Sequence, residues 1–282
     1  MNALELRGVT KRYPGFTLQD ITFSLPAGCI LGLVGENGAG KSTVIHLILD
    51  AMRPDEGEIC VLGRSNRSDF RSVKEELGVV LDEASFPESF ALPQIDAVLR
   101  RIYRQWDSQR FFDLARRFSL PRDRAFQDFS KGMKMKLSMA AALSHHARLL
   151  LLDEATSGLD PMVRDEILDL LLDFAREGDN AVLISSHIVS DLEKLCDYIA
   201  FLHGGRLLLC EEKDRLLEQY ALLTCSKADL AALPDGAVFV KRESAYGVEA
   251  LVQREKAPRG LELHPATLED IIVTLAKGDT LQ

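Results

Sequence analysis

The chain has 282 residues, 46% of them apolar and 27% charged, the balance of a globular protein with one large domain or two ordinary ones. Its net charge of −9 argues against nucleic-acid binding, because such proteins need a basic field to displace counterions from phosphates. Arg100, Arg101 and Arg104 form the densest basic strip, which is most simply a solvated helix face. We therefore expect no nucleic-acid partner.

The five cysteines are scattered, without the spacing of a metal site, and most lie in apolar runs. We expect buried free thiols in a reducing compartment. The amino-terminal residues contain no apolar signal-peptide core, and no uninterrupted apolar run approaches the roughly 18–20 residues that cross a bilayer. The sequence therefore predicts a cytoplasmic protein that reaches a membrane only through a partner chain.

The first part of the chain predicts β-strands at residues 3–9, 16–25 and 57–62, separated by turn-forming proline and glycine. A further apolar run at residues 29–34 leads into a glycine-rich loop, GENGAGKST, and then into an apolar helix.

This strand–loop–helix order is typical of a phosphate-binding loop. Its glycines let backbone N–H groups approach a phosphate chain, and the helix points its positive end at the same anion. Lys41 can reach the β- and γ-phosphates, and the Ser42 hydroxyl can ligate Mg²⁺. The sequence predicts a nucleoside triphosphate site made of Gly35, Asn37, Gly38, Ala39, Gly40, Lys41, Ser42 and Thr43.

Apolar residues at three- and four-residue spacing predict helices over residues 95–106 and 110–118, and a third after Ser130, within a helical part of about 84–148. Buried strands at 149–153, 181–185 and 199–202 then alternate with helices at 161–177 and 188–197. This alternation predicts a parallel α/β sheet.

Residues 211–282 predict a separate accessory unit, with a hairpin around residues 244–247 and a final helix that Thr267 caps. We therefore divide the chain into a domain of residues 1–210 and an accessory domain of residues 211–282.

Two carboxylates follow the leucine run of residues 149–152. Asp153 is placed to hold Mg²⁺ beside the phosphate loop, and Glu154 to polarise an attacking water. An acidic pair after a strand can also be a helix cap. The phosphate loop earlier in the chain favours the Mg²⁺ and catalytic roles over this alternative. His187 follows the next strand and so lies at the same sheet edge, although a single histidine there is often structural.

In this order the motifs resemble the nucleotide-binding subunit of an ATP-binding cassette (ABC) transporter over roughly residues 1–210. GENGAGKST is similar to the Walker A loop, LLLLDE to Walker B, FSKGM to the signature loop and SGLD to the D-loop. His187 falls at the switch-histidine position, and Tyr13 at the aromatic position that stacks on adenine.

The resemblance implies a P-loop NTPase core of mostly parallel sheet, with an antiparallel β part, an inserted helical subdomain and a small α+β extension. It also implies two subunits, identical or paralogous, that sandwich two ATP molecules and move a membrane permease. Ser130 and Gly132 then bind the partner's ATP, His187 the γ-phosphate in its own subunit, and Asp160 lies across the dimer interface.

Two motifs depart from the family pattern. Asp82 takes the place of the glutamine that contacts Mg²⁺, and Lys131 and Met133 replace glycine and glutamine in the signature loop. The SKGM form and the ending HPATLEDIIV are similar to a bacterial exporter branch with a separate permease. The alternatives are an importer ATPase with a regulatory tail and a cassette ATPase that acts on ribosomes or DNA.

Overall fold

The computed structural model describes residues 1–68, 70–82, 86–226, 229–230, 233–234, 236–244, 247–258, 260–277 and 279–280. The turn predicted around residues 244–247 lies partly outside the described residues. The carboxylate that follows Asp82 in the sequence lies wholly outside them. Within the described part of the chain, no helix is both long and apolar enough to cross a membrane.

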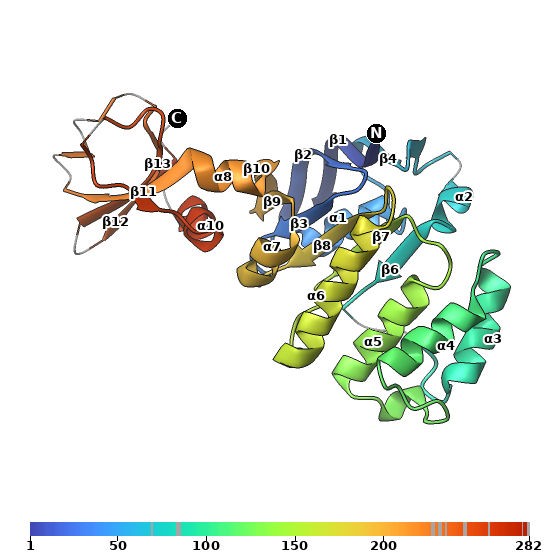
Figure 1. Ribbon diagram of the computed structural model, residues 1–282. Helices are drawn as coiled ribbons and strands as arrows, with labels where there is room; N and C mark the ends of the chain where they lie inside the picture. The colour runs from blue at the N-terminus through green and yellow to red at the C-terminus, as the bar shows by residue number, and fades with distance from the viewer. Residues whose placement is uncertain are drawn as a thin grey trace.

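The core is a six-stranded sheet in the order β10-β9-β3-β8-β7-β6 (Figure 1). Its strands β3, β6, β7, β8 and β9 are parallel, and β10 joins the edge antiparallel to β9. The strand bounds are β3 (Ile30–Val34), β6 (Leu77–Val80), β7 (Leu149–Asp153), β8 (Ala181–Ser186), β9 (Tyr198–His203) and β10 (Arg206–Glu212).

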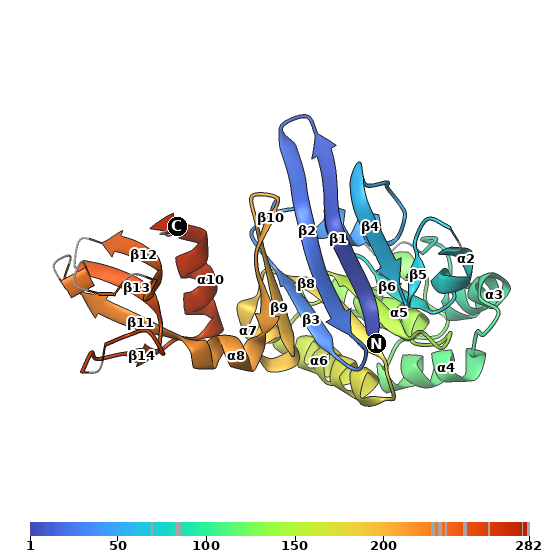
Figure 2. The ribbon, with the colours of Figure 1, turned by 90° about the horizontal axis from the view of Figure 1, so that it is seen from above.

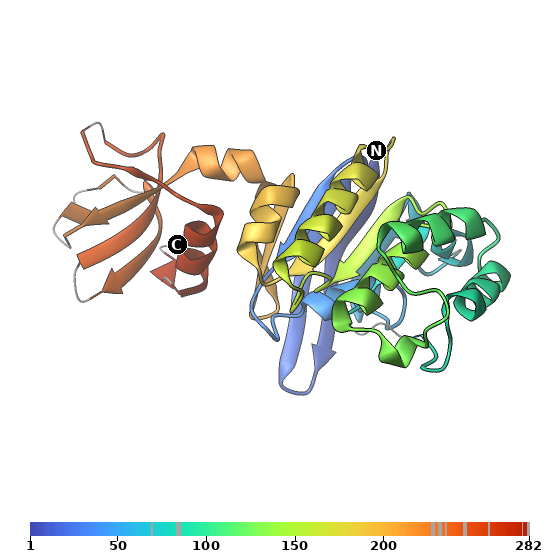
Figure 3. The same cartoon turned by 60° about the horizontal axis from the view of Figure 1, so that its bottom comes forward.

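Both faces of this sheet are buried, each in its own apolar core. Side chains alternate between the two faces along each strand. Leu149 and Leu151 of β7 pack into one apolar core with helix α1 (Lys41–Ile48). Leu150 and Leu152 pack into the other core, with α6 (Pro161–Arg176) and α7 (Val189–Leu195). Figure 3 shows α6 and α7 side by side over that face, in yellow and orange. The parallel α/β sheet predicted from the sequence is confirmed.

Antiparallel strands cover the α1 side (Figure 2). Their order is β2-β1-β4-β5, with bounds β1 (Asn2–Tyr13), β2 (Phe16–Pro26), β4 (Glu56–Val61) and β5 (Arg64–Ser65). The first strand is longer than the sequence predicted, because its pairing with β2 continues to the turn, where Tyr13 lies opposite Phe16.

A helical part lies at the β6 side of the sheet, shown in green in Figure 1. It contains α3 (Leu92–Ile102), α4 (Ser108–Arg117), the short helix η1 (Phe126–Asp128) and α5 (Lys131–Ala142), while α2 (Phe70–Lys74) precedes β6. The three predicted helices are confirmed, but α3 ends earlier than predicted, since Tyr103 is already extended.

The carboxyl-terminal unit stands at the β10 side, joined through α8 (Lys213–Gln219) (Figure 1). Its sheet has the order β14-β11-β13-β12-β15, and α10 (Leu268–Lys277) packs on α7 and α8. The strand bounds are β11 (Tyr220–Cys225), β12 (Val238–Ser244), β13 (Gly247–Gln253), β14 (His264–Pro265) and β15 (Asp279–Thr280). The Thr267 cap is confirmed, because Thr267 Oγ1 accepts a hydrogen bond from the Asp270 backbone N–H at 3.1 Å.

Strand β10 crosses the proposed division at residue 210: Glu212, its last residue, still pairs with Tyr198 of the main sheet. The cysteine prediction is only partly correct. All five thiols are free, but only Cys196 is fully buried, and Cys29, Cys60, Cys210 and Cys225 are half-buried.

Candidate nucleotide site

The phosphate loop links the carboxyl end of β3 to the first turn of α1. Gly38 and Gly40 have φ angles of +83° and +109°, which favour glycine. A side chain at Gly35 would come within 2.3 Å of the Leu202 carbonyl oxygen. Ala39 is buried in the core beneath the loop. Close backbone packing therefore fixes the loop, and the Ala39 N–H donates to the Glu36 carbonyl oxygen within it at 3.1 Å.

Lys41 directs its ammonium back over this loop. Its Nζ donates to the carbonyl oxygens of Gly35 at 2.8 Å and Glu36 at 3.3 Å. It also lies 3.2 Å from Glu154 Oε1, and only 6% of the lysine side chain is exposed. A buried ammonium on a glycine loop is suited to a polyphosphate, whose oxygens would compete with these partners.

The predicted carboxylates stand beside it at the end of β7. Asp153 is 5% exposed, and its Oδ1 accepts a hydrogen bond from Ser185 Oγ of β8 at 2.5 Å. Glu154 turns away from the strand with a φ of +51°, and its N–H donates to the same Ser185 hydroxyl at 3.0 Å. Ser185 thus orients both residues, a role that the sequence analysis missed.

His187 completes this group. Its Nδ1 lies 2.7 Å from Glu154 Oε2, so that Glu154 contacts Lys41 through one oxygen and His187 through the other. The structure therefore brings together the predicted residues Lys41, Asp153, Glu154 and His187, which lie at or beyond the carboxyl ends of the neighbouring strands β3, β7 and β8.

Tyr13 lies at the turn between β1 and β2. Its hydroxyl contacts Met52 Sδ at 2.8 Å, and its ring stacks on Phe16 with centroids 6.4 Å apart. Phe16 Cζ is 3.0 Å from the position that a Cβ on Gly40 would take, so Phe16 lies between Tyr13 and the phosphate loop. The sequence analysis missed Phe16, although an aromatic residue just after the turn was visible there.

A second group of predicted residues gathers around the first turns of α5 and α6. Ser130 caps α5 by accepting from the Met133 N–H at 3.3 Å, and Asp160 caps α6 by accepting from Val163 N–H at 3.1 Å. Gly132 faces Val163 at a distance that leaves room for one methyl group. Among the described contacts, none joins Ser130, Gly132 or Asp160 to the phosphate loop.

Asp82 belongs to this second group. Its Oδ1 lies 4.0 Å from Lys131 Nζ, and both side chains are more than half exposed. Lys131 Nζ also lies against Gly158, 3.1 Å from the position of a Cβ there. The two departures from the family pattern, Asp82 and Lys131, are therefore neighbours.

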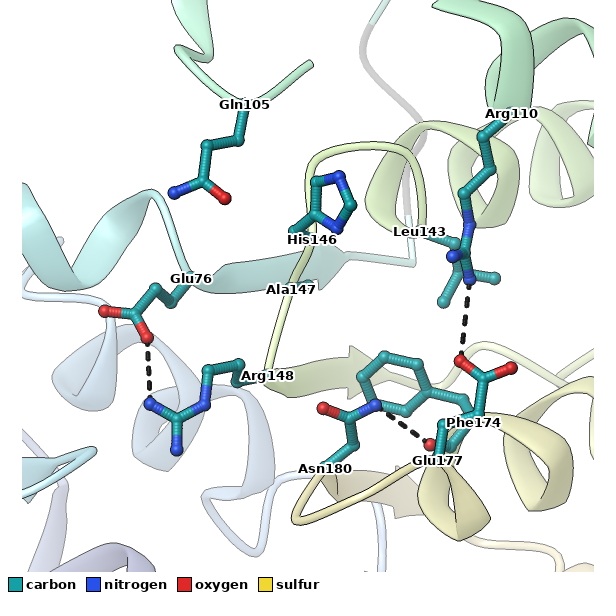
Figure 4. Close-up of a pocket in the computed structure, with 10 residues that line it drawn as sticks. All are labelled: Glu76, Gln105, Arg110, Leu143, His146, Ala147, Arg148, Phe174, Glu177 and Asn180. Carbon is teal, nitrogen blue, oxygen red and sulfur yellow. Dashed lines mark hydrogen bonds and ion pairs between the residues drawn. The ribbon is translucent and has the colours of Figure 1, made fainter. Parts of the chain in front are cut away.

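A cavity of about 330 Å³ lies at the opposite edge of the sheet (Figure 4). It is lined by residues just before β6, β7 and β8, which places it at the amino ends of the parallel strands. Its charges pair internally: Arg148 with Glu76 at 3.0 Å and Arg110 with Glu177 at 3.9 Å. Ligands of parallel sheets bind at the carboxyl ends, so this cavity is not the nucleotide site.

The family model described as ABC transporter matches residues 18–157. The ABC transporter ATP-binding protein YtrB of Bacillus subtilis (strain 168) is 32% identical, covering 77% of this chain and 74% of its own length. The Nod factor export ATP-binding protein I of Rhizobium leguminosarum bv. viciae is 34% identical, with coverages of 77% and 71%. This chain belongs to the ABC transporter family.

A solved structure described as an ATP binding subunit of an ABC transporter superposes on the chain with a TM-score of 0.70 and 27% identity. It covers 77% of this chain and 92% of its own. The chain is thus an ABC-type ATPase subunit, a domain that binds adenine nucleotide. The fold, the family and the ATPase activity predicted from the sequence are confirmed.

Among the described residues of this ABC ATPase, no cluster of three or more histidine, cysteine, aspartate or glutamate side chains could hold a metal ion. Mg²⁺ in phosphate-binding sites commonly takes most of its ligands from water and phosphates. The exposed Ser42 hydroxyl in the first turn of α1 and the Asp153 carboxylate are oxygen donors of the required kind.

Proposed function

We propose that this chain powers the export of a substrate through a separate integral membrane permease, by hydrolysing ATP between two ATPase subunits. The observation that carries the proposal is the convergence of Lys41, Glu154 and His187 at one sheet edge. Glu154 takes a proton from the attacking water, and Lys41 and His187 stabilise the charge of the γ-phosphate.

Magnesium completes the site that we propose. Ser42 and Asp153 would hold the ion, and Ser185 orients the carboxylate through its 2.5 Å hydrogen bond. The bound ion neutralises phosphate charge. Asp82 contributes at most through water, since its nearest described charged partner is Lys131.

In this proposal the second subunit completes the ATP site around the phosphate loop. Ser130 and Gly132, at the start of α5, contact the ATP of the facing subunit, and Asp160 lies across the interface. Supporting this, the first two residues of α6, Pro161 and Met162, are exposed, and Met162 beside Asp160 is 81% exposed. The partner is a second copy or a paralogue.

The permease docks, in this proposal, in the groove between α2 and the end of α3. This groove has a volume of about 680 Å³ and contains Arg71, Lys74, Arg101 and Arg104 around the exposed Ile102. Its lining also includes the Glu75 carboxylate, which accepts a hydrogen bond from the Arg104 backbone N–H at 3.0 Å. None of these four cations has an ion-pair partner within the described residues. In a chain of net charge −9, such a surface suits a cytoplasmic segment with carboxylates and an apolar side chain.

The direction of transport follows the relatives. The Nod factor protein is named as an export ATP-binding protein, and its similarity spans most of this chain. The chain would then lie in the cytoplasm, at the inner face of the membrane, through the permease.

The dimer is tested with Glu154→Gln, which keeps the ATP contacts but cannot accept the proton of water. We expect this variant to elute as a dimer with Mg·ATP and as a monomer without nucleotide on gel filtration. A monomer at saturating ATP, with binding confirmed separately, would contradict the sandwich.

The docking groove is tested by co-purification with an identified integral membrane protein after detergent extraction. The double change Arg101→Glu with Arg104→Glu should abolish recovery of the permease, whereas Arg117→Glu on α4 should not. Equal recovery with both variants would refute this docking position while leaving the ATPase assignment intact.

A further inference from the structure

A buried ion pair links α6 to α7. Arg164 Nε donates to Asp191 Oδ1 at 2.6 Å, and the Arg164 Nη2 group contacts the same oxygen and donates to Ser190 Oγ at 3.1 Å. Asp191 is only 1% exposed, whereas a quarter of the Arg164 side chain is exposed. The other oxygen of Asp191 is buried and has no hydrogen-bond partner among the described residues.

Each residue of the ion pair lies four positions after a residue to which we assign a role in the ATPase dimer. Arg164 follows Asp160 and donates its backbone N–H to the Asp160 carbonyl at 3.0 Å. Asp191 follows His187, in the turn where the Asp191 N–H donates to the Ile188 carbonyl at 3.2 Å. The ion pair therefore joins the first turns of two helices whose preceding loops carry Asp160 and His187.

The contacts continue to the ATP site. Ile188 N–H donates to Ser186 Oγ at 3.0 Å, which fixes the loop around His187 on β8. His187 Nδ1 contacts Glu154 at 2.7 Å, and Glu154 contacts Lys41 at 3.2 Å. An unbroken series of described contacts thus runs from Asp160 through Arg164 and Asp191 to the catalytic carboxylate.

We propose that Arg164 and Asp191 are positioning residues for ATP hydrolysis, which hold the His187 loop in register with the Asp160 loop. The inference rests on the proposed roles of His187 and Asp160. A buried pair of this kind adds little net stability compared with apolar side chains of similar volume, but its forked geometry fixes how two elements meet.

The same two helices provide a matched control. Lys194 of α7 lies 3.7 Å from Asp165 of α6, and both side chains are about two-thirds exposed. An exposed pair at this distance contributes little to stability or position. Removing it changes a charge on the same helices without touching the buried contact.

The experiment compares Asp191→Leu, which removes the buried carboxylate, with the conservative Asp191→Asn and the control Lys194→Gln. Each variant is checked for cooperative unfolding, and kcat, KM and ATP affinity are then measured. The ring signal of His187 is followed by NMR in histidine-labelled protein and assigned through His187→Gln.

We expect Asp191→Leu to lower kcat by on the order of 10- to 100-fold, with ATP affinity within about twofold, because misplacement of a catalytic group acts on turnover. The His187 signal should move in this variant. Asp191→Asn, which keeps the acceptor oxygen, and Lys194→Gln should retain both the parental kcat and the parental signal.

A folded Asp191→Leu protein with parental kcat, or with an unmoved His187 signal, would overturn the proposal. If Asp191→Leu does not fold, Arg164→Gln replaces it with the same readouts, and failure of both to fold would show that the pair serves stability alone. Parental turnover of His187→Gln would instead refute the proposed role of His187. This result can be told apart from a failure of the positioning proposal, because it does not depend on the His187 signal in the Asp191 variants.

Discussion

His145 makes the stability of this protein depend on pH, and the change His145→Phe isolates the effect. The ring is 1% exposed at the end of α5 and stacks on Tyr103, with centroids 4.0 Å apart and planes 12° from parallel. Its buried Nδ1 has no hydrogen-bond partner among the described residues, so phenylalanine can take its place without stranding a polar group.

Burial, aided by the positive charge of neighbouring His146, lowers the pKa of His145 from 6.5 to about 4. Between these values the unfolded chain binds a proton that the folded protein does not, so acidification favours unfolding. Each pH unit in this window costs about 1.4 kcal/mol. From pH 6.5 to pH 5.0 the loss is therefore about 2 kcal/mol.

Denaturant unfolding at pH 7.5 and pH 5.0 measures this loss. We expect the parent protein to lose about 2 kcal/mol more than His145→Phe between the two pH values. The exposed His264 offers a control, since His264→Gln should lose as much stability as the parent. Equal losses for the parent and His145→Phe would refute the assignment.

Three further predictions concern the ATP site and the tail. Tyr13→Ala should weaken ATP binding by about 1–3 kcal/mol, the cost of one lost base–aromatic stack, whereas Tyr13→Phe should change the affinity for ATP only slightly. GTP should compete with ATP at comparable concentrations in binding titrations. Asp82→Gln should keep or raise the basal ATPase rate, and Asp82→Ala should raise the Mg²⁺ concentration needed for half-maximal phosphate release. Parental values in both variants would show that Asp82 has no part in the site. A chain that ends at Glu212 keeps β10 whole and should still hydrolyse ATP with a lower Tm, since α10 no longer covers α7. A folded but inactive truncation would contradict this.

The convergence of the candidate site residues could be predicted largely from sequence, because these residues follow buried strands directly. Asp153 and Glu154 come after four leucines, and His187 comes after β8, so the parallel order of the strands alone brings them to one edge. The glycine loop is local in the chain, and its backbone requirements are visible as glycines.

Other contacts could not be predicted, since they join residues far apart in the chain without a local pattern. Ser185 looks like an ordinary strand residue until β7 lies beside it. Arg164 and Asp191 each fit an exposed position of an amphipathic helix, and only the packing of α6 on α7 buries the aspartate. The α8 helix follows β10 without a turn residue, and Glu212 gives no side-chain cap, so no sequence feature marked its start.

The most direct test of the account is phosphate release from Mg·ATP by the parent protein and by Glu154→Gln, with ATP affinity measured on the same samples. We expect the variant to bind ATP about as tightly as the parent but to turn over at least about 100-fold more slowly, because an amide cannot take the proton of the attacking water. Parental turnover in Glu154→Gln would contradict the catalytic role of Glu154 and, with it, the proposed mechanism.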